Sequence, residues 1–255
     1  MFRKTLSKKM QGHQNGFHFR GHEIKRIETF SDAVFAFAVT LLIVSLEVPK
    51  SFEELIITMR GFFPFAICFT LLMLIWHEQH VFFRRYGMED VLTNSLNCAL
   101  VFIVLFYVYP LKFLFTLIFN NNINVAGRSS LTITDSQAPV LMVIYGVGYV
   151  MIYFIFFLLY GHALRNKISL QLTTLEQFDT RTKMYGQLIL ISVGLLSVIT
   201  ALALPPGQAG LAGMVYVLTG VFLSVYFSIR GRMRRKIYHP GLTAPAETYD
   251  IPPAH

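Results

Sequence analysis

Residues 26–49 read RIETFSDAVFAFAVTLLIVSLEVP, and this stretch guides the interpretation of the whole chain. Most of it is apolar enough for the interior of a lipid bilayer. Even so, Ser31 and Asp32 lie where the apolar run begins, and Thr40 lies in its middle. Because an ionisable residue within a membrane span is expensive to bury, it is by default a candidate functional residue. The sequence therefore predicts a membrane helix whose polar side chains serve a purpose.

The composition is that of a membrane protein. Of the 255 residues, 54% are hydrophobic and 14% are charged, and the mean hydropathy is +0.53. A soluble domain would carry about 25% charged residues. Apolar runs of about 20 residues, the length that crosses about 30 Å of hydrocarbon, recur along the chain. We therefore expect an all-α integral membrane protein with six transmembrane helices, at residues 29–48, 60–83, 92–117, 139–162, 184–204 and 208–229.

Lysine and arginine are distributed unevenly around these spans. Eighteen of the 22 basic residues fall in the two terminal arms and in the loops after the second and fourth spans. By the positive-inside rule, this bias places both termini in the cytoplasm. We expect the basic arms to face anionic lipid and not nucleic acid. The chain then divides into a basic cytoplasmic arm (1–25), a six-helix transmembrane domain (26–236) and a disordered cytoplasmic tail (237–255).

The start of the first span carries a specific pattern. Residues 26–32 follow R-x-x-x-F-S-D, with Arg26, Phe30, Ser31 and Asp32 at the defined positions. Further matches are the pair Trp76-His77 late in the second span, Leu96-Asn97 early in the third, and Pro110 near its end. In these residues the chain resembles the transmembrane protein 175 family of potassium channels, in its prokaryotic single-repeat form. The resemblance implies a multi-pass protein of the prokaryotic cell membrane whose transmembrane domain is a channel.

The resemblance also implies an architecture for the pore. Single-repeat members are homotetramers in which four copies of the first helix surround one pore. The family places a bulky apolar side chain one turn before a threonine layer, and these positions correspond to Phe37 and Thr40. Phenylalanine departs from the aliphatic residue that the family often has there. Leu41 and Val44 would form the next apolar rings outward.

Physical chemistry is consistent with this role for the first helix. Four threonine hydroxyls would partly replace the water around a permeating potassium ion, and four phenylalanine rings would form a constriction that gates by losing its water. Because hydroxyls are weak ligands, we expect a modest preference for potassium. Glu47, near the outer end of the helix, would raise the cation concentration at the mouth.

The remaining polar residues near the cytoplasmic ends of the first three spans suggest one hydrogen-bond network. Such a network would hold the pore helix against its neighbours without contacting ions. An alternative is a proton-sensing site, because His77 could titrate near neutral pH. The residues of this signature network are Arg26, Phe30, Ser31, Asp32, Trp76, His77, Asn94 and Asn97.

Other interpretations of the same residues remain open. In a plain membrane anchor, Ser31 would cap the first helix, Asp32 would accept its free N–H groups, and Thr40 would bond back to Ala36. A secondary transporter or proton-coupled carrier would use Asp32 and His77 as a relay. A scaffold without conduction is a third possibility.

No catalytic motif supports an enzyme, and we expect neither a cofactor nor a metal site beyond permeating potassium. In WHEQH (76–80) the two histidines lie three residues apart, not four as in the zinc protease motif. Glu78 in this run is expected to pair with Arg84 or Arg85. The glycines of the fourth and sixth spans are expected to serve helix packing; they are Gly146, Gly148, Gly210, Gly213 and Gly220.

Overall fold

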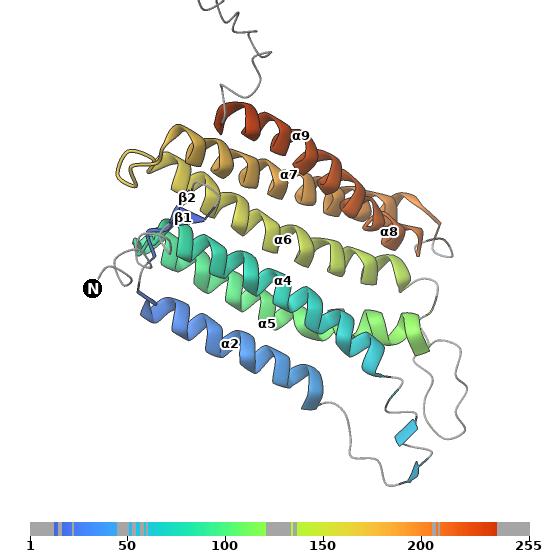
Figure 1. The fold of residues 1–255 in the computed structure, drawn as a ribbon. Helices are drawn as coiled ribbons and strands as arrows, with labels where there is room; N and C mark the ends of the chain where they lie inside the picture. The colour runs from blue at the N-terminus through green and yellow to red at the C-terminus, as the bar shows by residue number, and fades with distance from the viewer. Residues whose placement is uncertain are drawn as a thin grey trace, which may run out of the picture.

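The computed structural model is an elongated set of helices that lie side by side (Figure 1). It describes residues 13–14, 17–21, 23–44, 51–52, 55–56, 59, 61–120, 134, 137–205, 208 and 210–238. Its helices are α2 (Arg26–Val44), α4 (Phe62–Tyr86), α5 (Val91–Asn120), α6 (Ala138–Arg165), α7 (Thr174–Ala203), α8 (Leu211–Met214) and α9 (Val217–Tyr238). Two short antiparallel strands, β1 (His13–Gln14) and β2 (Phe17–His18), precede them.

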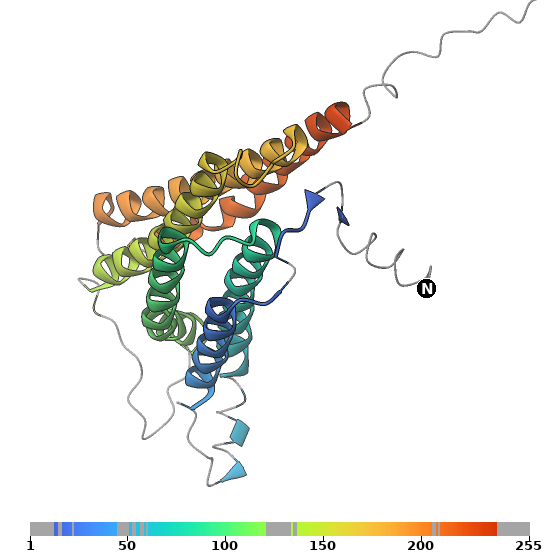
Figure 2. The same ribbon diagram turned by 90° about the vertical axis from the view of Figure 1, so that its left-hand side faces the viewer.

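The helices follow one another across the molecule nearly in chain order. α2 packs on α4 and α5, α5 packs on α6, and α7 lies between α6 and α9. Figures 1 and 2 therefore show α2 and α9 at opposite edges of the molecule. Five helices of the described chain are long and apolar enough to cross a membrane, namely α4, α5, α6, α7 and the segment Leu211–Arg235. The predicted all-α membrane architecture is confirmed.

Helix boundaries differ from the expected spans at informative places. α7 begins at Thr174, well before the predicted start at 184, because Thr173 and Glu176 form a reciprocal capping box. The predicted last span is divided into α8 and α9, and α9 continues to Tyr238. The turn expected at residues 205–207 connects α7 to α8, although Pro206 and Gly207 lie outside the described residues.

α2 begins earlier than expected, and this changes the role of its polar residues. Because the helix starts at Arg26, Ser31 and Asp32 lie in its second turn and do not cap it, so that expectation was wrong. The Ser31 hydroxyl instead donates to the carbonyl of Ile27 at 2.8 Å. The outer end of the predicted span, residues 45–48, lies outside the described residues.

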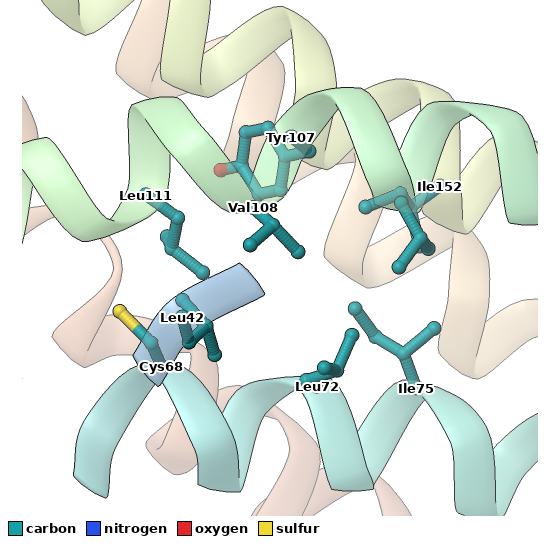
Figure 3. Close-up of a pocket in the computed structure, with 9 residues that line it drawn as sticks. Leu42, Cys68, Leu72, Ile75, Tyr107, Val108, Leu111 and Ile152 are labelled. Atoms are coloured by element: carbon teal, nitrogen blue, oxygen red, sulfur yellow. The ribbon is translucent and has the colours of Figure 1, made fainter. Parts of the chain in front are cut away.

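The core lies between α2, α4, α5 and α6. It contains a cavity of about 10 Å³, around which Leu42 of α2, Leu72 of α4 and Leu111 of α5 gather (Figure 3). The hydroxyl of Tyr107, which also lines the cavity, already donates to the carbonyl of Tyr145. A buried water needs two to four polar partners, so we expect this space to stay dry. The inner face of α2 is therefore held by apolar packing at this level.

Two glycines allow α6 and α7 to approach closely. A Cβ atom on Gly146 would lie 2.3 Å from Cγ2 of Val198, and one on Gly194 would lie 2.7 Å from Cγ2 of Val150. The packing role expected for Gly146 and Gly148 is confirmed. Around Gly210, Gly213 and Gly220 the described residues leave open space, so the same expectation was wrong there.

Gly146→Ala is expected to lower the free energy of unfolding by about 1–3 kcal/mol, because the added methyl overpacks the interface between α6 and α7. Val198 is β-branched and cannot rotate freely out of the way. Gly220→Ala makes the same chemical change in open space and should alter stability by no more than about 0.5 kcal/mol. Thermal unfolding of both purified variants in detergent measures the difference. Equal midpoints would show that α6 and α7 do not pack through Gly146.

The segment before α2 is anchored to the ends of distant helices. Arg20 forms an ion pair with Glu176 of α7 at 2.8 Å, and its Nε donates to the carbonyl of Leu170 at 2.6 Å. Phe17 is buried, and its ring packs nearly perpendicular to that of Tyr86. A Cβ on Gly21 would lie 2.6 Å from the carbonyl oxygen of Phe83, so only glycine fits there. Part of the basic arm thus binds a carboxylate of its own chain.

Candidate functional site

α2 has one buried face and one open face. Ser31, Phe35, Ala38 and Leu42 recur at helical spacing and are buried against α4 and α5. On the opposite face, Phe30 is 55% exposed and Phe37 is 56% exposed. Ala33, Ala36 and Thr40 lie on the same exposed face. A large apolar surface of this kind usually marks an interface or a membrane contact.

A buried chain of hydrogen bonds fixes the inner face of α2. The amide of Asn97 on α5 donates to the Ser31 hydroxyl at 2.7 Å. The amide of Gln79 on α4 donates to the Asn97 side-chain oxygen, also at 2.7 Å. All three side chains are at most 2% exposed. Because unpaired polar groups are costly in the buried interior, these hydrogen bonds set both the position and the rotation of α2.

Asp32 makes a second tie between α2 and α4. Its Oδ1 accepts a hydrogen bond from Nε1 of Trp76 at 2.7 Å, and the Trp76 ring stacks on His80. His77 is exposed, and no hydrogen bond or ion pair joins it to another described residue. The structure therefore brings Asp32 and Trp76 together but does not include His77 in the contacts around α2.

The other signature residues surround an open groove beside the start of α2. Arg26, Phe30 and Asn94 line it together with Ile27 and Glu89. No described hydrogen bond or ion pair links Arg26 to Asp32. Asn94 donates to the backbone carbonyl of Glu89 at 3.2 Å. The predicted network is thus two separate ties, at Ser31 and at Asp32, with an open groove next to them.

Asp90 orders the turn between α4 and α5. It accepts hydrogen bonds from the Thr93 hydroxyl at 2.6 Å and from the backbone N–H of Thr93 at 3.2 Å, at the start of α5. His162 of α6 lies with its Nε2 2.7 Å from Oδ2 of Asp90, the same oxygen that accepts the Thr93 N–H. Partial burial would raise the pKa of Asp90, but these hydrogen bonds outweigh it and lower the pKa below its ordinary value. The carboxylate therefore remains charged and joins α5 to α6 near the groove.

The residues predicted to line a pore share the open face of α2 as far as it is described. Phe37 and Thr40 are exposed, and Leu41 is half-buried. The Thr40 hydroxyl donates to the carbonyl of Phe37 at 2.7 Å. The plain-anchor interpretation had expected the carbonyl of Ala36 as its partner. Val44 ends α2, but its side chain lies outside the described residues, as does Glu47. Among the described residues, no group of three or more His, Cys, Asp or Glu could hold a metal ion.

The chain is similar to known proteins over most of its length. Residues 26–110 match the family described as Endosomal/lysosomal potassium channel TMEM175. A curated relative, a potassium channel from Marivirga tractuosa, is 39% identical over 234 residues, which cover 87% of this chain and 93% of the relative. This chain belongs to the TMEM175 family. The resemblance inferred from R-x-x-x-F-S-D is confirmed, although the comparisons do not test the motif itself.

Two further matches are also with potassium channels. The crystal structure of a variant of the potassium channel MtTMEM175, in complex with a Nanobody-MBP fusion protein, superimposes with a TM-score of 0.74. It is 39% identical, and the match covers 87% of this chain and 99% of that chain. A potassium channel from Chamaesiphon minutus is 29% identical over 96 residues, 47% of its length. The TMEM175 family and the apolar helices together establish a multi-pass membrane protein.

Several residues of this TMEM175 protein were missed by the sequence interpretation. Glu78 binds Lys183 of α7 at 2.8 Å and accepts the Tyr160 hydroxyl at 2.7 Å, so the expected pairing with Arg84 or Arg85 was wrong. Gln79, beside it, completes the Ser31–Asn97 chain. Two adjacent polar residues inside an apolar helix were the available signal, because each needs a partner when buried. The sequence did not show that those partners lie on α5, α6 and α7.

Proposed function

We propose that this protein is a potassium-permeable channel in which four identical subunits surround a pore lined by α2. The observation that carries the proposal is the division of α2 into a buried face, tied to α5 through Ser31, and an open face with Phe37 and Thr40. A helix fixed in rotation by Ser31 and Asp32 presents the same side chains in every subunit. The named activity of the relatives, potassium channels, supports the same conclusion.

The local geometry of Thr40 suits it to contact a cation. Its hydroxyl proton is directed to the carbonyl of Phe37, so its oxygen lone pairs remain available. Four such oxygens would partly replace the hydration shell of potassium. Four Phe37 rings one turn away would form the narrow apolar constriction. Leu41 and Val44 would continue the apolar lining, and Glu47 would attract cations at the outer mouth.

The membrane arrangement completes the proposal. Both termini lie in the cytoplasm, as the distribution of lysine and arginine predicts, and the basic arms lie against anionic lipid. Ions move passively down their electrochemical gradient, without a cofactor and without catalysis. A carrier relay through Asp32 and His77 has less support, since Asp32 is bound to Trp76 and His77 is exposed and apart from it.

Recordings from purified protein in planar bilayers test the assignment of the pore. Thr40→Ala should lower the potassium-to-sodium permeability ratio about fivefold, the effect of losing about 1 kcal/mol of hydroxyl–ion interaction. Phe37→Ala should widen the constriction and increase the resting current. Both changes are on the exposed face of α2, so assembly should persist.

Matched controls separate pore effects from general damage. Thr70 on α4 is also exposed and also bonds back to its own helix, at Ala66, so Thr70→Ala should leave the permeability ratio unchanged. Phe102 on α5 is 71% exposed, and Phe102→Ala should leave the resting current unchanged. Normal permeation in both α2 variants would remove this helix from the pore. Smooth saturable flux without unitary current steps would indicate a carrier instead.

A further inference from the structure

An open groove of about 360 Å³ runs between α7 and α9, at the edge of the molecule opposite α2. Its volume falls within the range of about 300–1,000 Å³ that is typical of ligand sites. The α7 side is formed by Leu188, Ser192 and Leu196, with further apolar neighbours, and the α9 side by Phe222 and Tyr226. Such a lining suits a hydrocarbon chain.

One end of this groove is basic. Arg181 lies one helical turn before Tyr185, which lines the groove, so both project from the same side of α7. Arg181 is exposed, and no hydrogen bond or ion pair joins it to another described residue. Arg230 of α9 lies with its guanidinium carbon 4.3 Å from the centre of the Phe178 ring. A groove with an apolar lining and a cationic end matches a lipid with an acyl chain and an anionic head group.

Arg230 is held in place but retains hydrogen-bonding capacity. Its Nε donates to the Thr182 hydroxyl at 3.0 Å, which orients the guanidinium group. The side chain of Tyr226, which lines the groove, also interacts with Arg230, and these two partners engage only part of the guanidinium group. Arginine presents five N–H groups in a rigid fork, and this geometry matches a phosphate. Tyr185 and Tyr226 line the groove, and tyrosine rings are enriched at the boundary between hydrocarbon and head groups.

The occupant follows from these observations. We propose that the groove between α7 and α9 binds an anionic phospholipid, with one acyl chain along Ser192 and Leu188 and the phosphate between Arg181 and Arg230. The site is separate from the proposed pore, so its occupancy and ion conduction are measured independently. This lipid site also differs from the diffuse attraction of anionic lipid to the basic arms, because binding requires the groove and both arginines.

Lipid quenching of a fluorophore in the groove tests the proposal. The reporter is the full chain with Cys98→Ser and Ser192→Cys, labelled at residue 192, since Cys68 is buried. Brominated phosphatidylglycerol should quench it at a lower mole fraction than brominated phosphatidylcholine. Arg181→Gln should weaken the apparent affinity for phosphatidylglycerol about fivefold, the contribution of one arginine near an anionic lipid surface.

The control variant is Arg165→Gln, which removes an exposed arginine from the end of α6, away from the groove. It should leave the preference for phosphatidylglycerol unchanged. Equal quenching by the two lipids would overturn the proposal, and so would an equal loss of preference in Arg165→Gln and Arg181→Gln. A disulfide between two copies of the unlabelled Ser192→Cys protein would show that another subunit, and not lipid, covers the groove.

Discussion

Asn97→Leu is expected to lower the free energy of unfolding by about 2–4 kcal/mol and to abolish normal conduction. Asn97 is fully buried and accepts from Gln79 while donating to Ser31. Leucine has a similar volume, so the main cost is an unsatisfied Gln79 amide and the loss of the tie to α2. Because this tie sets the rotation of α2, the open face should no longer be fixed in the assembly. Thermal unfolding in detergent and bilayer recordings measure the two effects.

Two further variants make the cause specific. Asn94→Leu alters an asparagine on the same helix that is half-buried and bonds to the backbone of Glu89, so it should cost less than about 1 kcal/mol. In the double variant Gln79→Leu with Asn97→Leu, no buried amide remains unpaired, and much of the stability should return while conduction does not. If Asn94→Leu and Asn97→Leu were equally unstable, the Ser31–Asn97–Gln79 chain would not be what holds α2.

Glu176→Ala is expected to release the segment before α2 and to cost about 3–5 kcal/mol, the usual penalty for removing one partner of a buried ion pair. Glu176 is 1% exposed and accepts from both terminal nitrogens of Arg20, at 2.8 and 3.2 Å. It also accepts from the backbone N–H groups of His18 and Thr173. Limited trypsin digestion should cut faster after Arg20 and Lys25 in the variant.

The matched control for Glu176 is an exposed ion pair in the same region. Glu89 binds Lys25 at 3.0 Å, but its side chain is 55% exposed. Glu89→Ala should therefore change stability by about 0–1 kcal/mol, because water screens such pairs. Glu176→Gln keeps the side-chain shape and the ability to accept, and it should fall between the two alanine variants. Unchanged trypsin cleavage in Glu176→Ala would show that this contact does not hold the segment.

Much of the architecture could be predicted from residue patterns. The apolar runs located α4, α5 and α6 to within a few residues, because the length of a membrane span is set by the hydrocarbon thickness. R-x-x-x-F-S-D identified the family. The family resemblance predicted that Phe37 and Thr40 line a pore, and the structure leaves both side chains exposed on α2. In each case the information lies within one segment of chain.

Helix starts were harder to predict because polar residues belong to both helices and loops. Residues 174–183 carry charges, so they were assigned to a loop, yet they form the first turns of α7. Their carboxylates and hydroxyls find partners on other elements, as Asp179 does with Arg234 of α9 at 2.8 Å. Similarly, one interpretation made Ser31 a helix cap because the apolar run begins there, whereas α2 begins at Arg26.

The sequence by itself determined that the chain crosses a membrane many times, belongs to a potassium-channel family, and has one helix that combines an apolar run with Ser31, Asp32 and Thr40. Only the tertiary structure decided which polar groups meet. Asn97 of α5 binds Ser31 of α2 and Gln79 of α4. Arg20 binds Glu176, which lies 156 residues away in the sequence. The reason is physical: hydropathy acts on each segment separately, whereas a buried donor is satisfied only by an acceptor that folding brings within about 3 Å.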